Sequence, residues 1–263
     1  LEAMVETLDG IRIQTEDAGL FLRDYAAGIE ADPNRLREVD DRLDLKAGTF
    51  TTATGSRNSR IAPVRAAAAS GMDALCHAIE SYTSVIASPL SEMYSLEAIG
   101  LIAENLRTCV HNGKNLEARE AQMLGSLYAG IGLANAGVGA AHSLSYPLGG
   151  KYGISHGVAN TLMLPRIMEF NLPGALEKFA AVAEMMGENT EGLSVRDAAM
   201  LAVEAVDLLI EDCDIATSLE ELGIPEEDFP EMAKVAMTVA RPLENNPRKV
   251  TLEDAIAIYR TAL

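Results

Sequence analysis

The sequence predicts an all-α fold, a helical bundle preceded by a separate N-terminal helical segment. From Pro63 onward, apolar residues recur at helical spacing almost throughout. Glycine and proline divide this stretch into pieces of ordinary helix length. There are no paired segments of alternating apolar and polar residues that would indicate strands, and there is no internal repeat.

The chain divides into three parts along its length. Residues 1–47 carry apolar residues at roughly helical spacing among many acidic and basic ones. Asp32 suits an N-cap and Pro33 a first helical position, so we expect two amphipathic helices here. Residues 48–62 are rich in Thr, Ser and Gly and read as a linker. The remaining residues, 63–263, are expected to form one helical domain.

The elements of this third part follow from its periodicity. We expect helices near residues 65–86, 91–111, 115–135, 139–148, 156–170, 174–187, 194–212, 226–239 and 251–262. The limits are supported by Pro89, Gly113, Pro147, Gly187, Pro225 and Pro247.

Composition excludes several classes of function. A chain of 263 residues with 48% hydrophobic residues is long enough to bury a core. The net charge of −18 argues against a nucleic-acid partner, because phosphate binding requires clustered Lys and Arg. The apolar stretches fall short of the ~20 residues that a membrane span needs, so we expect no membrane partner.

Cysteine usage and the first residues suggest the compartment. The three cysteines, Cys76, Cys109 and Cys213, are scattered and show no disulfide or zinc-ribbon spacing. The N-terminal sequence lacks a basic region followed by an apolar core, unlike a secretory signal. We therefore expect a cytoplasmic protein.

The chain has four histidines, and three of them lie in two unusual segments, GMDALCHAIESY and GAAHSLSYPLGGKYGISHGVAN. In the first segment, Asp73 and His77 are four residues apart in a strongly helical stretch, so they share one helix face. A carboxylate and an imidazole at this spacing can bind one divalent cation together. The pair also fits the commoner case of a surface or capping pair.

The second segment contributes two more imidazoles. His142 and His156 are each followed by small residues and are separated by a Pro-Leu-Gly-Gly break, where we expect one helix to end. Such a break lets two helices aim both side chains at one point. Three imidazoles and one carboxylate suit Fe(II) or Zn(II). Each histidine alone also fits a buried or capping role, which we assign to His111 near a predicted helix C-terminus.

Three segments carry a resemblance to a known family: GMDALCHAIESYTS, GAAHSLSYPLGGKYGISHGVANTLMLPRIMEFN and NPRKVTLEDAIAIYRTAL. They resemble the iron-dependent (group III) alcohol dehydrogenase family, in the same order along the chain. In that family a C-terminal helical bundle holds a divalent metal through an Asp, a His four residues later and two further His fourteen apart. The resemblance implies the same role for Asp73, His77, His142 and His156.

The resemblance also implies a catalytic position. The family usually carries another His four residues after the third ligand, near the nicotinamide, where it assists proton transfer or substrate binding. Tyr146 occupies that position here. Tyrosine can donate a hydrogen bond, but it does not titrate near neutral pH as an imidazole does.

The nucleotide-binding part of the family has no clear counterpart in the sequence. Family members carry an α/β domain with a Gly-Gly-Gly-Ser pyrophosphate loop before the helical domain, whereas this sequence shows no such turn and no P-loop. The segment FTTATGS resembles only the Thr-rich stretch that lines the family's cofactor cleft, which implies NAD(P) contacts for Thr51, Thr52 and Ser56. We therefore expect the usual nucleotide-binding domain to be missing and NAD(P) binding to be impaired.

Three functions remain open. The first is a metal-dependent alcohol dehydrogenase in which the cation polarises the oxygen of a small alcohol or aldehyde for NAD(P)-linked hydride transfer. The second is a truncated, stand-alone metal-binding helical module without redox activity. The third is a helical interaction protein with vestigial ligands. A homo-oligomer is compatible with all three. Metal content separates the third from the others, and cofactor binding separates the first from the second.

Overall fold

The structure, a computed structural model, describes residues 61–263, with side chains from residue 66 onward. Three predictions lie outside the described residues: the helices of 1–47, most of the linker, and the cofactor contacts Thr51, Thr52 and Ser56. Within residues 61–263 every regular element is a helix and no strand occurs, which confirms the all-α prediction. The first helix that the structure describes begins at Ile61, inside the stretch predicted as linker.

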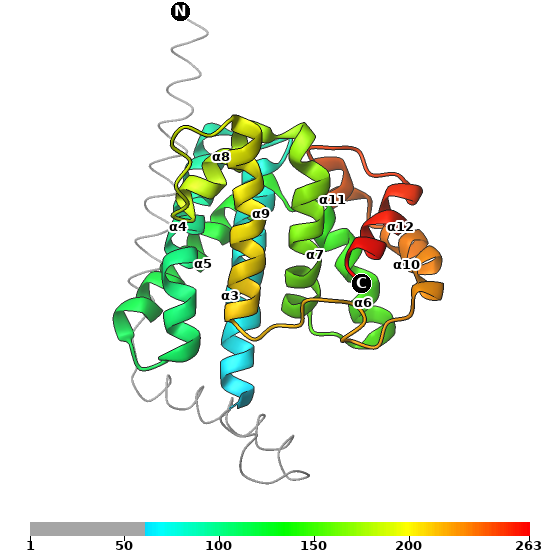
Figure 1. Ribbon diagram of the computed structural model, residues 1–263, viewed down its shortest axis with the longest axis horizontal. Helices are drawn as coiled ribbons and strands as arrows, with labels where there is room; N and C mark the ends of the chain where they lie inside the picture. The colour runs from blue at the N-terminus through cyan, green and yellow to red at the C-terminus, as the bar shows by residue number, and fades with distance from the viewer. Residues whose placement is uncertain (1–60) are drawn as a thin grey trace, which may run out of the picture. The chain divides into compact units, whose positions relative to one another are not determined.

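The helices pack into one bundle (Figure 1). In chain order they are α3 (Ile61–Thr83), α4 (Pro89–His111), α5 (Leu116–Ala136), α6 (Ala140–Tyr152), α7 (His156–Asn171), the 3-10 turn η1 (Leu172–Gly174), α8 (Leu176–Met185), α9 (Val195–Asp212), the 3-10 turn η2 (Glu226–Asp228), α10 (Phe229–Ala236), α11 (Ala240–Asn245) and α12 (Leu252–Thr261).

Several helices begin where a side chain satisfies their first free N–H groups. Ser88 caps α4 in a reciprocal bond with Ser91, and Pro89 occupies the first helical position, where no N–H is needed. Thr251 and Asp254 form the same kind of box at the start of α12. Such local signals explain why the observed starts of α4 and α12 lie within two residues of the predicted ones.

Helix α6 runs further than predicted. We expected it to end at residue 148, but it continues through Pro147 to Tyr152 and ends at Gly153, whose φ is +69°. The proline removes one backbone hydrogen bond. Pro147 is nevertheless buried, and Tyr259 of α12 donates its hydroxyl hydrogen to the carbonyl of Leu144 at 2.6 Å. Packing therefore holds the helix together, and the predicted Pro-Leu-Gly-Gly break is wrong, because the chain turns only after Gly153.

The region after α9 also differs from the prediction. The single helix predicted at 226–239 is the short turn η2 followed by α10, and α11 was not predicted at all. Helix α11 spans six residues, Ala240–Asn245, which is too short for a hydrophobic period to be recognised.

Helix α3 lies at the centre of the bundle, packed against α4, α5 and α7. Its buried side chains include Met72, Leu75 and Ile79. At its C-terminal end the backbone of α5 comes very close, because a Cβ on Gly132 would lie 2.3 Å from Oγ of Ser95 in α4 and 2.8 Å from Oγ of Ser81 in α3. This close packing fixes the position of α3.

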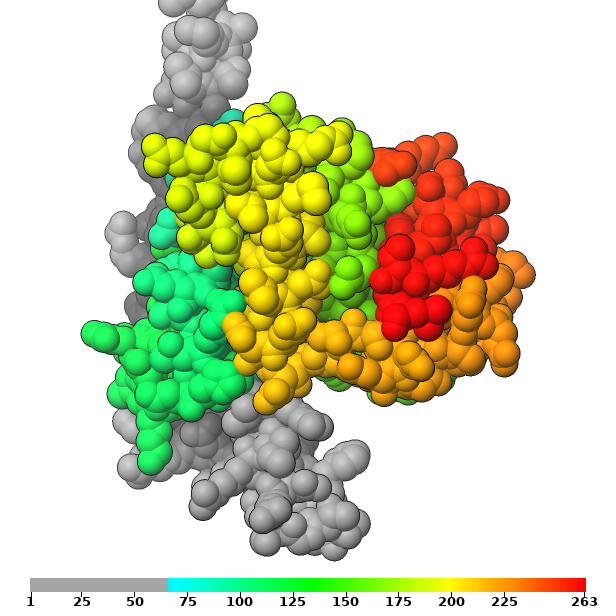
Figure 2. All heavy atoms as spheres, in the orientation of Figure 1, coloured from blue at the N-terminus to red at the C-terminus, as the bar shows by residue number. Residues whose placement is uncertain are grey.

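The other helices complete the bundle around α6 and α7. Helix α9 packs against α8 and α7, and α10 packs against α6 and α12. Figure 2 shows atoms of α8 and α9 covering one face between the α4–α5 pair and the C-terminal residues. Among the described helices no single one is long and apolar enough to cross a membrane; α5 and α6 meet the criterion only together, and they are bent by 104°.

Candidate metal centre

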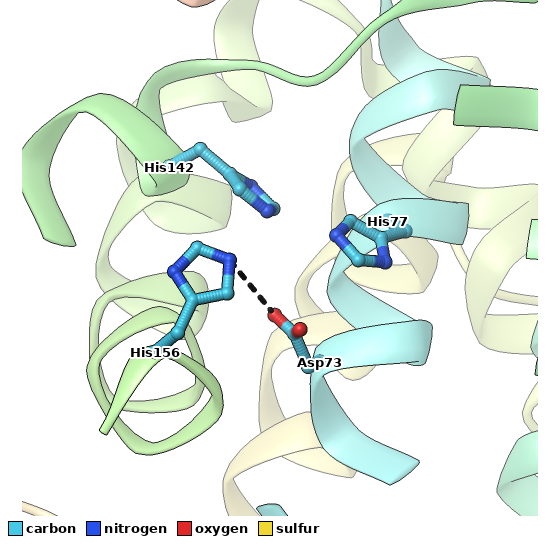
Figure 3. Close-up of side chains that lie close together, drawn as sticks. All are labelled: Asp73, His77, His142 and His156. Atoms are coloured by element: carbon cyan, nitrogen blue, oxygen red, sulfur yellow. Dashed lines mark ion pairs between the residues drawn. The ribbon is translucent and has the colours of Figure 1, made fainter. Parts of the chain in front are cut away.

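The four predicted ligands come together from three helices. Asp73 and His77 project from one face of α3, one turn apart. His142 lies in the first turn of α6, and His156 is the first residue of α7. Figure 3 shows all four side chains directed at a common point. One nitrogen or oxygen from each lies within 4.8 Å of the others, so the group could hold a single metal ion.

The rings are close to one another but not equally exposed. The ring centroids of His77 and His142 are 4.9 Å apart and nearly parallel, and those of His142 and His156 are 5.3 Å apart. Nε2 of His156 lies 3.8 Å from Oδ1 of Asp73. The side chain of His156 is 64% exposed, whereas that of Asp73 is 18% exposed. The cluster is therefore open to solvent on the His156 side.

A buried carboxylate accepts a hydrogen bond from His142 on the side of the ring that faces away from the cluster. Glu80, on the same helix as Asp73 and His77, places Oε2 2.5 Å from Nδ1 of His142 and is only 4% exposed. A carboxylate can only accept, so the imidazole carries its hydrogen on Nδ1 and directs the lone pair of Nε2 into the cluster. Burial lowers the pKa of His142, but the charge and hydrogen bond of Glu80 outweigh this, and the pKa of His142 is raised.

Glu80 also stabilises the start of α6. Gly139, at the N-cap position, offers no side chain, so the first N–H groups need partners from elsewhere. The N–H of Ala141 donates to Oε1 of Glu80 at 2.7 Å, and the N–H of Ala140 donates to Oδ1 of Asn246 at 3.2 Å. A negative charge at a helix N-terminus is itself favourable. These two bonds fix the turn that carries His142.

The net pKa shift of His77 is opposite to that of His142. The pKa of His77 is lowered, chiefly because burial disfavours the charged imidazolium, although Asp73 opposes the shift. A lowered pKa favours the neutral imidazole, which is the form that binds metals.

A buried amide lies against the ligand atoms. Asn160 is fully buried in α7, and its Nδ2 lies 2.7 Å from Oδ1 of Asp73 and 3.0 Å from Nε2 of both His142 and His156. The hydroxyl of Ser145 donates to Oδ1 of Asn160 on the other side. The amide thus joins three of the four predicted ligands.

Sequence reasoning missed Glu80, Asn160 and Ser145. Each lies one helical turn from a predicted ligand: Glu80 three residues after His77, Ser145 three after His142 and Asn160 four after His156. Polar residues at these offsets share the face of the ligand and end up buried beside it. That spacing was the signal available in the sequence.

Tyr146 does not lie among the four ligands. Its side chain is 63% exposed, one turn after His142 on α6, and it lines a pocket of about 200 Å³ between α6 and α10 with Pro147, Lys151 and Met232. Lys151 forms an ion pair of 2.6 Å with Asp228 beside this pocket.

The fourth histidine and the cysteines have no place in the cluster of four. His111, at the end of α4, bonds through Nε2 to the carbonyl of Asp212 at the end of α9, at 2.7 Å. The role is structural, as predicted, but the bond reaches the last carbonyl of α9, whereas the prediction concerned the end of the helix that carries His111. Cys76, Cys109 and Cys213 are all free thiols. Burial raises the pKa of Cys76 well above its ordinary value, so its thiol stays protonated beside Glu80.

Comparisons with known proteins agree with the fold and the order of these motifs. The profile of the Fe-containing alcohol dehydrogenase family, C-terminal part, matches residues 67–263. The chain is 46% identical to the 1,3-propanediol dehydrogenase of Citrobacter freundii over 200 residues, and 40% identical to the lactaldehyde reductase of Escherichia coli K12 over 195 residues. These matches cover 76% and 74% of this chain and 51% and 50% of the two relatives.

Solved structures give the same result. A 1,3-propanediol oxidoreductase superposes with a TM-score of 0.73 at 45% identity, over 74% of this chain and 51% of that one. An alcohol dehydrogenase from Oenococcus oeni also gives 0.73, at 42% identity, over 75% and 51%. The chain therefore spans about half the length of the relatives it matches. By sequence and by fold, it belongs to the Fe-containing alcohol dehydrogenase family, of which it represents the C-terminal helical part.

Proposed function

We propose that the chain binds one divalent cation, Fe(II) or Zn(II), through Asp73, His77, His142 and His156, as the metal-binding part of a metal-dependent alcohol dehydrogenase. The observation that carries the proposal is the convergence of these side chains from α3, α6 and α7, with ligand atoms within 4.8 Å of one another. If Asp73 and His77 were only a surface or capping pair, there would be no reason for two imidazoles from other helices to lie beside them.

The chemistry of the donors fits such an ion. Imidazole nitrogen and carboxylate oxygen are ligands that Zn(II) and Fe(II) both accept. The lowered pKa of His77 favours its neutral form, and Glu80 holds His142 in the tautomer that leaves Nε2 unprotonated. A buried carboxylate that accepts a hydrogen bond from a ligating histidine is typical of metal sites. A histidine with a purely structural role does not need an unprotonated Nε2 that faces other ligands.

The other residues predicted from the sequence would bind the substrate and the cofactor. A bound cation would supply Lewis-acid polarisation of an alcohol or carbonyl oxygen, which favours hydride transfer to or from NAD(P). The exposed side of the cluster at His156 offers an approach for a small alcohol or aldehyde, the kinds of compound after which the relatives are named. Tyr146, exposed on α6, is proposed as a catalytic residue that donates a hydrogen bond near the reacting groups. Thr51, Thr52 and Ser56 are proposed as NAD(P) contacts.

A second candidate is a metal-binding helical module without redox activity of its own. It is favoured by the net charge of −18, which repels an anionic cofactor. The two candidates share the metal site and differ in NAD(P) binding.

Metal analysis tests the proposal. The chain, purified without chelator or added metal, is expected to contain about one divalent ion per molecule, measured by inductively coupled plasma mass spectrometry. His156→Ala should lose most of this ion and the thermal stabilisation that accompanies it. His111→Ala is the matched control, because His111 bonds to a helix end outside the cluster. Equal metal content in the parent and in His156→Ala would refute the ligand assignment.

A further inference from the structure

Helices α4 and α5 present large apolar side chains to solvent. In Figure 1 the two helices lie side by side, at the side of the described bundle away from α10 and α12. Six of their apolar side chains are between 40% and 72% exposed: Leu90, Met93, Leu116, Met123, Leu124 and Leu127. We call these six residues the α4–α5 face. The proposed metal ligands lie on other helices, α3, α6 and α7.

The apolar side chains of α5 follow helical spacing. Leu116, Met123 and Leu127 are seven and four residues apart, so they line one side of the helix. Within the described residues α5 packs mainly against α3 and α4, and the side chains buried there, such as Ala118 and Ala129, lie on its opposite side. The exposed stripe is about 16 Å long, because each helical residue rises 1.5 Å. It is long enough to contact about three turns of another helix.

Helix α4 extends this surface beside α5. The two helices approach closely, because a Cβ on Gly125 would lie 2.9 Å from Cγ1 of Ile102 and 3.2 Å from Cβ of Leu101. Nearer the start of α4, the rings of Tyr94 and Tyr128 contact each other across the two helices, with centroids 5.4 Å apart. Aliphatic and aromatic side chains therefore occupy the line along which α4 and α5 meet.

Such a surface favours an interaction. Exposed apolar side chains that are scattered singly are normal, whereas a set that follows one face commonly marks a contact surface. Two of the six are methionines, whose flexible side chains adapt to the shape of a partner. An amphipathic helix carries apolar side chains every three or four residues and buries them against a surface of this kind. The spacing along α5 matches that periodicity.

Charge determines which helix fits. Exposed glutamates accompany the apolar side chains on both helices: Glu97 on α4, and Glu117 and Glu120 on α5. The whole chain carries a net charge of −18, so a second copy would bring like charges together. Residues 1–47 contain more acidic than basic residues, so they are no better suited by charge. A partner with Lys or Arg beside its apolar stripe gains complementary contacts.

We propose that the α4–α5 face binds an amphipathic helix of another protein, one whose apolar stripe is flanked by Lys and Arg. Contacts with Leu116, Met123 and Leu127 supply most of the affinity, because burial of apolar area is the main favourable contribution to association. The glutamates speed association and select against acidic helices, and their effect weakens as the salt concentration rises. Binding does not require the proposed metal, since no ligand belongs to this face.

Peptide binding to the full chain, measured by fluorescence anisotropy, tests the proposal. The probe is a labelled synthetic peptide of about 18 residues, with Leu at helical spacing and Lys at the other positions. It should bind saturably, one peptide per chain. Two control peptides should bind at least about tenfold more weakly. One carries Glu in place of Lys, and the other has the same composition in scrambled order.

Changes to the apolar contacts give the first set of variants. Leu127→Ser should weaken binding of the Leu/Lys peptide about tenfold, and Met123→Ser should act in the same direction. The matched control is Leu208→Ser on α9, because Leu208 is 55% exposed and Leu127 is 54% exposed. All three side chains are exposed, so the fold should persist, which melting temperatures verify.

Changes to the charges give the second set. Glu97→Gln combined with Glu120→Gln should weaken binding and reduce its dependence on salt concentration. Glu204→Gln combined with Glu253→Gln alters the net charge equally, at exposed positions on α9 and α12. This second pair should weaken binding much less, because the proposal places the peptide on α4 and α5.

Three results would overturn the proposal. The first is a Leu/Lys peptide that does not bind saturably. The second is equal binding of the scrambled peptide, or equal binding by Leu127→Ser, which would show attraction by net charge alone. The third is self-association of the chain without peptide, measured by sedimentation velocity, that Leu127→Ser abolishes. That result would assign the face to a second copy of the chain.

Discussion

Glu80 and His142, 62 positions apart in the chain, are joined by a hydrogen bond of 2.5 Å between Oε2 and Nδ1. The other oxygen of Glu80 accepts the N–H of Ala141 at 2.7 Å. One buried carboxylate therefore ties the central helix α3 to the first turn of α6 and sets the orientation of a proposed ligand. This relationship gives the most direct test of how the cluster is held.

Glu80→Gln should weaken metal binding roughly 10–100-fold, because outer partners of ligating imidazoles contribute on this scale. Glu80 accepts from three donors, the ring of His142, the N–H of Ala141 and the thiol of Cys76. Glutamine has a single acceptor oxygen, so at least one donor loses its partner and the fold loses about 1–3 kcal/mol. Calorimetric titration with Zn(II) and thermal unfolding measure the two effects. Glu104→Gln, at an exposed position on α4, is the control. Unchanged affinity in Glu80→Gln would show that His142 is oriented without it.

Gly132→Ala should destabilise the protein by about 1–3 kcal/mol, because the added methyl would lie 2.3 Å from Oγ of Ser95 and 2.8 Å from Oγ of Ser81. The matched control is Gly130→Ala on the same helix, where a Cβ meets nothing within 4 Å. That change should stabilise the helix by up to ~1 kcal/mol. Urea unfolding curves give both values, and equal effects at the two positions would contradict the close packing of α3, α4 and α5.

Thr251→Val should raise the pKa of Asp254. That pKa is lowered chiefly by the hydrogen bond from the Thr251 hydroxyl and then by the backbone N–H of Thr251. A carboxyl with a lowered pKa stabilises the folded state above its ordinary pKa of about 3.9. That stabilisation disappears as the pH falls through the folded-state value.

The variant should therefore be less stable than the parent at neutral pH, by about 1 kcal/mol for the lost cap. The part of this difference due to the carboxylate should vanish in acid. Carboxyl NMR titration and thermal melts across the pH range measure both effects. An unchanged Asp254 pKa in Thr251→Val would show that the side-chain bond does not form.

The 263-residue chain by itself is expected to show no saturable NAD(P) binding by calorimetry, with or without metal. The net charge of −18 repels an anionic cofactor. Without a positioned nicotinamide, hydride transfer also loses roughly 7–11 kcal/mol of barrier reduction. Micromolar binding that Thr51→Ala or Thr52→Ala abolishes would reverse this expectation and favour the complete redox reaction.

Much of the fold could be predicted from the sequence because its signals are local. Helical periodicity and nearby caps depend on residues within about four positions of one another, and they placed α4, α7, α9 and α12 to within two residues at each end. Asp73 and His77 share a face for the same reason, since one helix carries both. The unusual segment around His142 and His156, and then the family motifs, indicated these two as the remaining predicted ligands.

Only the tertiary structure decided how distant segments meet. Helix α6 continues past Pro147 because Tyr259 and the surrounding core support it, and its start is satisfied by Glu80 and Asn246. None of these partners is near α6 in the chain. The placement of Asn160 against three proposed ligands also depends on the packing of α7 on α3 and α6. Such contacts depend on how whole helix faces pack together. That packing is determined by many residues along each helix, so a short sequence motif does not predict it.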